Sequence, residues 1–279
     1  HRARARKHCR GRQEAGRDVS EITLVGASKM NDADACRQAI AAGIDVLGEN
    51  REQEMTKKLA EHAYDGAPLH FIGHLQRNKV KNVVGKVAMI ESVGSLELLS
   101  AIDKQAEKLG IVQDILLEVN IGGEEAKSGF APESLEQAAE EAKKCANVRV
   151  RGLMCIPPVA EGEHGSLPYF EKVHALFVDI NAKLYDNTLD ILSMGMSGDY
   201  EDAVRAGATM VRVGTAIREL LAAGIALAVA VRVEHERPQA LGLPVAAAAD
   251  GLLDEDRTDR EEHDSHYDQC QNDITNTHG

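Results

Sequence analysis

The chain alternates short apolar runs with helical stretches, and this alternation constrains its fold more than any other feature. Each apolar run is followed by a polar or glycine-bearing turn and then by apolar residues at helical spacing, which is the pattern of βα units. The predicted strands are Ile22–Ser28, Asp45–Leu47, Leu69–Ile72, Val87–Glu91, Asp114–Asn120, Val150–Ile156, Ile191–Met194 and Met210–Val213. The predicted helices are Ala33–Ala42, Glu52–Glu61, Lys79–Val84, Leu96–Leu109, Pro132–Cys145, Tyr169–Leu184 and Tyr200–Ala206, with a last one beginning near Ala216.

Eight βα units in about 200 residues favour an α/β fold of the (β/α)₈ type, a closed TIM barrel, over a doubly wound sheet. The first predicted strand is not followed by the G-x-G-x-x-G turn that would favour the doubly wound alternative. In a barrel of this type the chemistry lies at the carboxyl ends of the strands. The residues predicted there are polar or glycine: Lys29, Glu49, Asn50, His74, Gln76, Ser92, Asn120, Ser193, Ser197, Asp199, Gly214 and Thr215.

Lys29 is the candidate nucleophile among these residues. A lysine that follows a strand is usually a solvated loop residue. In a mostly apolar barrel mouth, however, an amine can lose its proton and attack a carbonyl to form a Schiff base. Val25, Ala27 and Lys29 alternate onto one face of the first strand, so small residues would line the route to the amine.

Two glycine-bearing segments, Met194–Asp199 and Val213–Thr215, follow the seventh and eighth predicted strands. They offer backbone N–H groups and hydroxyls at the usual phosphate position of this fold. The alternative is that these glycines only permit tight turns. The candidate ligand-binding residues of this region are Ser193, Met196, Ser197, Gly198, Gly214 and Thr215.

Arg212 lies inside an apolar run, where an unpaired guanidinium would be costly to bury. It therefore needs a partner, which is either a buried Asp or Glu or an acceptor on a ligand, such as a ring nitrogen or a phosphate. Asn50 and His74 are further pocket candidates. Asn50 could equally cap the following helix, and His74 could be a packed polar residue.

Composition excludes several classes of function. Aromatic residues make up 3% of the chain, there is no Trp, and the formal net charge is −13, so a nucleic-acid-binding surface is not expected. The five cysteines form no C-x-x-C pair, which is typical of reduced thiols in a cytoplasmic protein and predicts no metal site. The longest apolar run, Leu220 to Val231, is too short for a membrane span.

The two ends of the chain differ from the rest in charge. Residues 1–12 contain six Lys and Arg, and residues 250–279 contain ten Asp and Glu against two Arg. We expect residues 1–15 to be a disordered fragment edge rather than a targeting segment, and residues 220–279 to be a largely disordered extension. Residues 16–219 form the predicted barrel, a single domain.

Several motifs occur in order at family-like spacing, and together they resemble the pyridoxal-phosphate homeostasis proteins, relatives of the alanine racemase N-terminal barrel. The motifs are LVGASK (Leu24–Lys29), GEN (Gly48–Asn50), HFIGHLQRNK (His70–Lys79), KSGF (Lys127–Phe130), LSMGMSGD (Leu192–Asp199) and MVRVGTAI (Met210–Ile217). The resemblance covers about Gly16 to Ile217 and ends where the family continues GTAIFG, because this chain reads GTAIRE.

The resemblance implies a cofactor, pyridoxal 5′-phosphate, and a role for each matching residue. Lys29 would form the Schiff base, Asn50 would line the pocket, and Ser197, Gly214 and Thr215 would hold the phosphate. Arg212 would face the pyridine nitrogen, and Lys127 would be an accessory lysine near the pocket mouth. Because arginine stays charged and has no acceptor, the ring nitrogen would remain unprotonated and the ring would be a poor electron sink.

The implied function is intracellular pyridoxal-phosphate homeostasis, in which a monomer holds the cofactor and supplies it to apo-enzymes without significant catalysis. A racemase is the alternative, but it needs a second base opposite the lysine, and no tyrosine of this chain matches that role by position. A Schiff-base aldolase that uses Lys29 without a cofactor is a third hypothesis. Visible absorbance separates the aldolase from the other two.

Overall fold

The computed structural model describes residues 21–124, 128–162 and 164–214, in which eight parallel strands close into a barrel. The strands are β1 (Thr23–Ala27), β2 (Val46–Glu49), β3 (Leu69–Phe71), β4 (Met89–Val93), β5 (Gln113–Val119), β6 (Val148–Cys155), β7 (Ile191–Ser193) and β8 (Met210–Val213). Each strand pairs with the next, and β1 pairs with β8 to close the ring. The predicted (β/α)₈ fold is confirmed.

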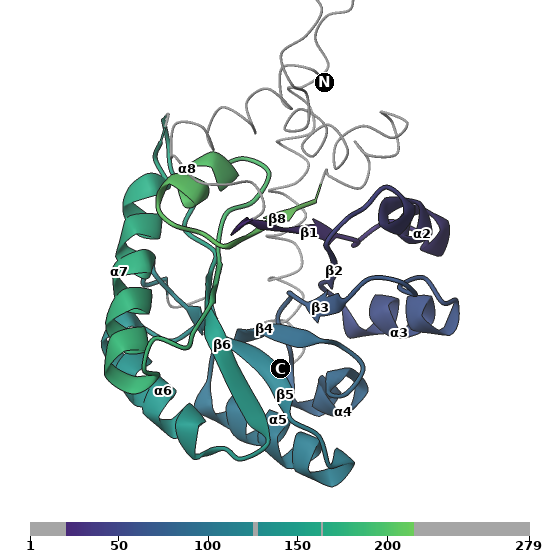
Figure 1. Cartoon of the computed structure of the whole chain (residues 1–279), viewed down its shortest axis with the longest axis horizontal. Helices are drawn as coiled ribbons and strands as arrows, with labels where there is room; N and C mark the ends of the chain where they lie inside the picture. Colours follow the sequence, from purple (N-terminus) through teal and green to yellow (C-terminus); the bar gives the residue numbers. More distant parts are fainter. Residues whose placement is uncertain (1–20, 125–127, 163, 215–279) are drawn as a thin grey trace, which may run out of the picture. The chain divides into compact units, whose positions relative to one another are not determined.

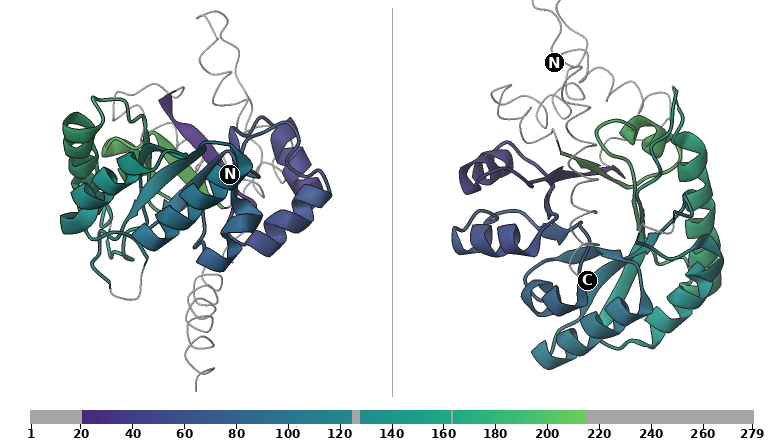
Figure 2. Two further views of the ribbon diagram at one scale, coloured as in Figure 1. Left: turned by 90° about the horizontal axis from the view of Figure 1, so that it is seen from below. Right: turned by 180° about the vertical axis from the view of Figure 1, so that it is seen from behind.

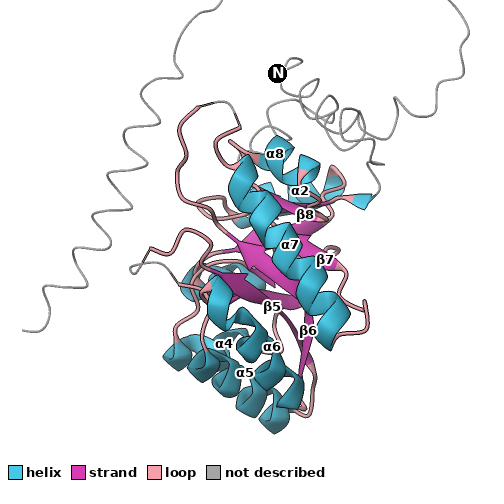
Figure 3. Ribbon diagram, turned by 90° about the vertical axis from the view of Figure 1, so that its left-hand side faces the viewer, coloured by secondary structure: helices cyan, strands magenta, loops and turns pink. Residues whose placement is uncertain are grey.

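Helices lie outside the ring of strands (Figure 1). They are α2 (Ala33–Ala41), α3 (Glu52–Ala60), α4 (Val80–Val83), α5 (Leu96–Leu109), α6 (Leu135–Lys144), α7 (Leu167–Leu184) and α8 (Tyr200–Arg205), with 3₁₀ turns at Arg77–Lys79 and Pro132–Ser134. Figure 2 shows the same arrangement from below and from behind, and in Figure 3 α5, α6 and α7 lie on one outer side of the barrel. Within the described ranges, no helix is long and apolar enough to cross a membrane.

The main hydrophobic core lies between the barrel wall and the helices. Outward-facing strand residues such as Leu47, Phe71 and Leu117 pack there against helix residues such as Ile102 and Phe170, all of them essentially inaccessible to solvent. Full burial of each such side chain contributes about 1.5–3 kcal/mol. This layer fixes the register of the strands, because a shift by one residue would turn every apolar side chain to the other face.

The barrel interior contains smaller apolar clusters. One consists of Val25, Ala27, Val46, Ile72 and Met210, and another of Met89, Leu116 and Met154. Val25 and Ala27 therefore face inward, as the alternation in the first strand predicts, whereas Leu24 packs on the helix side.

Helix α5 begins and ends where the sequence predicts. Ser95 accepts a hydrogen bond from Leu98 N at 3.2 Å, and Gly110 ends the helix in the left-handed conformation with φ 65°.

Other predicted boundaries shift. Strand β4 runs from Met89 to Val93 rather than Val87 to Glu91, and β2 extends through Glu49. The predicted ends were Glu91 and Leu47, and both strands continue further, because the side chains of Glu91 and Glu49 are buried and hydrogen-bonded. The last predicted helix, near Ala216, and both predicted terminal segments lie outside the described residues.

Candidate functional site

Lys29 lies in the turn that follows β1 at the carboxyl end of the barrel, which we call the mouth. The side chain is half-buried, and the residue lies two positions beyond Ala27, the last residue of β1. Strand β1 pairs with β8 so that Val25 stands beside Arg212. The structure thus places Lys29 in the turn that follows the strand beside Arg212, further toward the mouth.

Asn50 follows β2 and is half-buried at the same end of the barrel. Its Oδ1 atom is buried and has no hydrogen-bond partner among the described residues. The predicted alternative, a helix cap, is wrong, because the cap position of α3 is Arg51. Gly73 packs against Asn50 so closely that a Cβ there would lie 2.2 Å from the Asn50 carbonyl oxygen. An orphaned buried amide oxygen indicates a ligand donor.

Four buried side chains form a continuous hydrogen-bonded chain inside the barrel, which we call the relay. His70 Nδ1 lies 2.7 Å from Glu91 Oε1, and Ser193 Oγ donates to Glu91 Oε2 at 2.6 Å. Arg212 donates through Nη1 to Ser193 Oγ at 2.7 Å and through Nη2 to the Cys155 carbonyl oxygen at 2.9 Å. The relay connects β3, β4, β7 and β8.

Glu91 stays ionised within the relay although it is completely buried. Burial by itself raises the pKa of this carboxyl, but the hydrogen bond and charge of His70, the charge of Arg212 and the hydrogen bond from Ser193 outweigh burial and lower it. The Glu91 carboxylate compensates Arg212 only through Ser193, so the predicted direct pair with a buried Asp or Glu is not formed among the described residues. It makes two of its hydrogen bonds within the described residues and keeps further N–H donors.

Glu118 on β5 is a second buried carboxyl of the interior. It faces the same side as Leu116, Ser128 approaches its Oε1 at 3.4 Å, and its Oε2 has no partner among the described residues. Burial raises the pKa of this carboxyl, which the hydrogen bond from Ser128 and the charge of Arg212 only partly offset. Glu118 therefore favours its neutral form more than an exposed glutamate does.

Gly198 and Gly214 leave open space beside the mouth. A Cβ on either glycine would meet no heavy atom of the described residues within 4 Å, and neither has the positive φ that would itself require glycine. Tight-turn geometry therefore does not explain these two glycines. The adjacent Gly195 is different, because its φ is 92° and a Cβ there would lie 2.5 Å from Ala203 Cβ.

The remaining predicted residues differ in what they can offer. Met196 donates its backbone N–H to Asp199 Oδ1 at 2.7 Å, and Ser193 donates its single hydroxyl hydrogen to Glu91. Ser197 and His74 are exposed at the carboxyl end of the barrel. Lys127 and Thr215 lie outside the described residues.

Polar and charged side chains accompany the apolar clusters of the barrel interior. The interior below the mouth contains His70, Glu91, Glu118 and Arg212, of which only Arg212 was expected. The signal for the other three was present in the sequence, because each is a charged or polar residue within a predicted strand and directly follows an apolar residue. Strands of a barrel are covered on both faces, so such a residue requires a buried partner.

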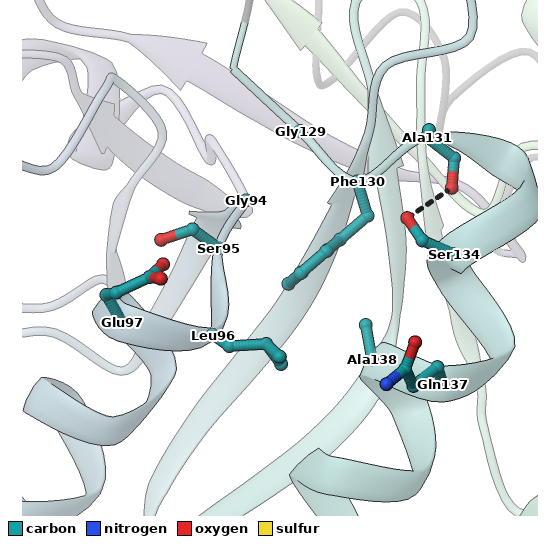
Figure 4. Close-up of a pocket in the computed structure, with 10 residues that line it drawn as sticks. All are labelled: Gly94, Ser95, Leu96, Glu97, Gly129, Phe130, Ala131, Ser134, Gln137 and Ala138. Atoms are coloured by element: carbon teal, nitrogen blue, oxygen red, sulfur yellow. Dashed lines mark hydrogen bonds between the residues drawn. The ribbon is translucent and has the colours of Figure 1, made fainter.

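A separate hollow of 290 Å³ lies between the first turns of α5 and α6 (Figure 4). Leu96, Phe130 and Ala138 form its apolar side, and Ser95 and Gln137 are among its polar residues. The hollow contains no predicted cofactor-binding residue from the described part of the chain. It is therefore distinct from the mouth.

Comparisons with known proteins identify the family. Residues 22–220 match the family described as alanine racemase, N-terminal domain. The pyridoxal phosphate homeostasis protein of Aquifex aeolicus is 44% identical over 212 residues, which are 76% of this chain and 91% of that protein. The chain belongs to the pyridoxal phosphate homeostasis protein family. A second member of this family, from Pseudomonas aeruginosa, is 41% identical over 208 residues, which are 74% of this chain and 87% of that protein.

Solved structures of this homeostasis family have the same fold. PipY of Synechococcus elongatus without PLP has a TM-score of 0.68 and 32% identity, covering 74% of this chain and 96% of that one. The same protein with PLP bound has a TM-score of 0.65 and 32% identity, covering 71% and 92%. Alanine racemase of Clostridium difficile, at 19% identity and a TM-score of 0.55, covers 77% of this chain and 56% of its own and shares the barrel fold.

Proposed function

We propose that the protein binds pyridoxal 5′-phosphate at the barrel mouth, holds it as a Schiff base on Lys29, and supplies it to apo-enzymes without significant catalysis. The observation that supports this most is the placement of Lys29 at the end of β1, next to the strand that bears Arg212. The site offers one group for each functional part of this cofactor. The amine suits the aldehyde, the fixed guanidinium suits the ring nitrogen, and the open glycine-bearing edge suits the phosphate.

The described residues fit the cofactor in three independent respects. Asn50 has a buried oxygen that lacks a donor, Arg212 keeps N–H donors beyond the relay, and Gly198 and Gly214 leave space that a side chain would fill. The cofactor, when bound, supplies an aldehyde that condenses reversibly with an amine. Lys29 provides that amine, and Ser197 and Thr215 are the proposed hydroxyl donors to the phosphate. Lys127 is proposed as the accessory lysine.

The relay supports binding without turnover. Arg212 donates hydrogen bonds and cannot accept them, so a ring nitrogen that faces it is held without a proton. Glu91 neutralises the charge of Arg212 and fixes its direction. A ring held in this way withdraws electrons weakly, which disfavours proton abstraction from an attached amino acid.

The positions of the tyrosines argue against the racemase alternative. Tyr64 donates to Glu49 on the helix side of the wall, and Tyr185 donates to the Ala139 carbonyl oxygen. Tyr169 and Tyr200 begin helices, and Tyr267 lies outside the described residues. In the described ranges no tyrosine lies in the barrel interior, where a second base would be required.

The test is absorbance followed by reduction. Purified protein incubated with the cofactor should develop a visible band, and borohydride should then fix the cofactor to one peptide. We expect mass spectrometry to place it on Lys29. Attachment to another lysine, or no band at all, would refute the proposed covalent site. A protein that binds phosphorylated carbonyl substrates on Lys29 without cofactor would support the aldolase hypothesis.

A further inference from the structure

A second polar group lies directly behind the turn that contains Lys29, on the helix side of the barrel wall. It consists of Ser28, Glu49, Lys58 and Tyr64, and we call it the Glu49 cluster. Gly48 marks the interior face of β2, since a Cβ there would contact Val25 and Ile72, so Glu49 faces the helices. Ser28 and Glu49 are completely buried, and Lys58 and Tyr64 are each 6% exposed.

Three donors converge on one oxygen of this cluster. Lys58 Nζ lies 2.6 Å from Glu49 Oε1, the Tyr64 hydroxyl donates to the same oxygen at 2.7 Å, and Ser28 Oγ donates to it at 2.5 Å. Glu49 Oε2 has no partner among the described residues. Cys36 borders the cluster, and burial raises the pKa of its thiol.

Stability alone does not account for such a cluster. Removing two opposite charges from water costs several kcal/mol per ion, and apolar residues of similar volume often serve a protein equally well. Apolar residues would therefore be sufficient to stabilise the fold at this position. The contacts of the ion pair between Lys58 and Glu49 indicate which group it orients.

Ser28 is held through all of its polar groups. Its N–H donates to the Gly48 carbonyl oxygen at 2.8 Å, and its hydroxyl is held by Glu49. Its carbonyl oxygen accepts from Lys58 Nζ at 2.7 Å and from Asn31 N at 3.1 Å. The bond from Asn31 closes a β-turn whose two central residues are Lys29 and Met30.

The turn itself requires support. Met30 has φ 61°, a left-handed conformation that costs a non-glycine residue roughly 1–2 kcal/mol. Ser28 is the first residue of the turn, so its carbonyl oxygen sets the direction of the turn and of the Lys29 side chain. Lys58 and Glu49 fix that carbonyl and the adjacent hydroxyl from the rigid wall and from α3.

We infer that Glu49 and Lys58 are positioning residues, which orient Lys29 for attack on an aldehyde by clamping Ser28. This inference rests on the proposed function, because it concerns the same amine. The cluster contacts the turn from behind, so it affects the approach of the amine and leaves the ring and phosphate contacts unchanged. The bond concerned forms between Lys29 Nζ and the aldehyde carbon, and the carbonyl oxygen leaves as water.

The experiment compares two ligands in matched variants. Pyridoxine 5′-phosphate has an alcohol in place of the aldehyde, so its affinity reports the pocket without the lysine chemistry. The rate at which the visible band forms with pyridoxal 5′-phosphate reports the position of the amine. In Lys58→Met we expect the rate to fall tenfold to a hundredfold, as roughly 1 Å of misplacement does, while alcohol affinity stays within about twofold.

Two further variants control for a general loss of stability. Lys58→Met alone leaves Glu49 uncompensated and could unfold the chain. The double variant Glu49→Gln, Lys58→Met removes both charges and keeps an acceptor for Tyr64 and Ser28, and it should show the same loss of rate. Arg151→Met removes a cation from an ion pair on the strands β5 to β7 and should leave the rate unchanged.

The outcomes are decisive. Equal loss of rate and alcohol affinity, or an unchanged rate in the folded double variant, would overturn the positioning role. Borohydride mapping of the wild-type protein separates the two proposals. If the cofactor is found on Lys29 and the variants behave like the wild type, the positioning role fails alone. If the wild type carries no cofactor on Lys29, the proposed function fails and the positioning role fails with it.

Discussion

Arg212 on β8 donates a 2.7 Å hydrogen bond to Ser193 on β7, and the same serine hydroxyl donates to Glu91. Ser193 thereby connects a buried positive charge on β8 to a carboxylate on β4, three strands from β7 around the barrel. The three side chains are each at most 4% exposed, so water cannot replace any of these contacts. The direction of the Arg212 guanidinium is set by this arrangement.

Glu91→Gln should destabilise the fold strongly. It leaves the Arg212 charge buried without a compensating anion, and breaking such a pair costs about 3–5 kcal/mol. Ser193→Ala keeps both charges and removes one hydroxyl, so it should cost about 1–3 kcal/mol. Urea denaturation of the two variants measures the difference. Equal losses would show that the charge of Glu91 contributes nothing beyond its hydrogen bonds.

Lys29→Ala should abolish cofactor trapping by borohydride, because it removes the attacking amine. Lys57→Ala is the matched control, since Lys57 is an exposed lysine on α3. The measurement is peptide mass after reduction. Trapping that persists in Lys29→Ala and disappears in Lys57→Ala would move the site elsewhere.

Gly214→Val should fold normally and bind the phosphate poorly. Because no atom of residues 21–124, 128–162 and 164–214 lies within 4 Å of the added Cβ, we expect the free energy of unfolding to change by less than about 0.5 kcal/mol. The new side chain fills the proposed phosphate space, so affinity for pyridoxal 5′-phosphate should fall tenfold or more, about 1.4 kcal/mol.

Pyridoxal, which lacks the phosphate, is the comparison ligand for Gly214→Val, and its affinity should change little. Thr215→Val removes one hydroxyl donor and should weaken phosphate binding by about 1–3 kcal/mol. If the wild type bound pyridoxal and its phosphate equally well, the phosphate site would have to be abandoned.

Stability should decline in acid partly through Asp114. Burial raises the pKa of this carboxyl, but hydrogen bonds and charges of Arg149 and Arg151 outweigh burial and lower it below its usual range. A carboxyl with a lowered pKa stabilises the fold above its unfolded-state pKa, near 3.9, and loses that contribution as pH falls through its folded-state pKa. Urea midpoints of Asp114→Asn should therefore fall less steeply than those of the wild type below about pH 4. Parallel curves would contradict this.

The protein should not exchange the Cα proton of L-alanine above background when it is loaded with cofactor. The proposed ring contact to Arg212 disfavours a carbanion, and a second interior base is missing from the described ranges. Incubation in heavy water followed by chiral analysis measures this. Exchange with inversion near one event per second, lost in Lys29→Ala, would make the protein a racemase.

The alternation of apolar runs was enough to predict the barrel, because each βα unit is encoded locally. Helix α5 was predicted at both ends, since Ser95 and Gly110 lie next to it in the chain. Strand β4 was predicted to end at Glu91 but continues to Val93, because Glu91 is an interior acid whose partners lie on other strands.

The site was predicted only in part for the same physical reason. Lys29, Asn50 and Arg212 are positioned by their own strands, so the sequence indicates where they lie. The contact between Ser193 and Arg212, and that between His70 and Glu91, depend on how strands meet across the barrel. Glu49 was expected at the mouth, whereas it faces the helices and holds Lys58.

The pairing of β1 with β8 joins Thr23 to Met210. The barrel therefore closes only after β8, the last of its eight strands in the sequence, has been synthesised. Arg212 lies on β8, and Lys29 lies in the turn that follows β1. Contacts between such distant parts of a chain form late in folding, because the entropic cost of closing a long loop comes before the favourable contact energy. The proposed aldehyde-binding lysine therefore lies beside the strand of Arg212 only after β8 has been translated, and we expect no cofactor trapping on shorter nascent chains.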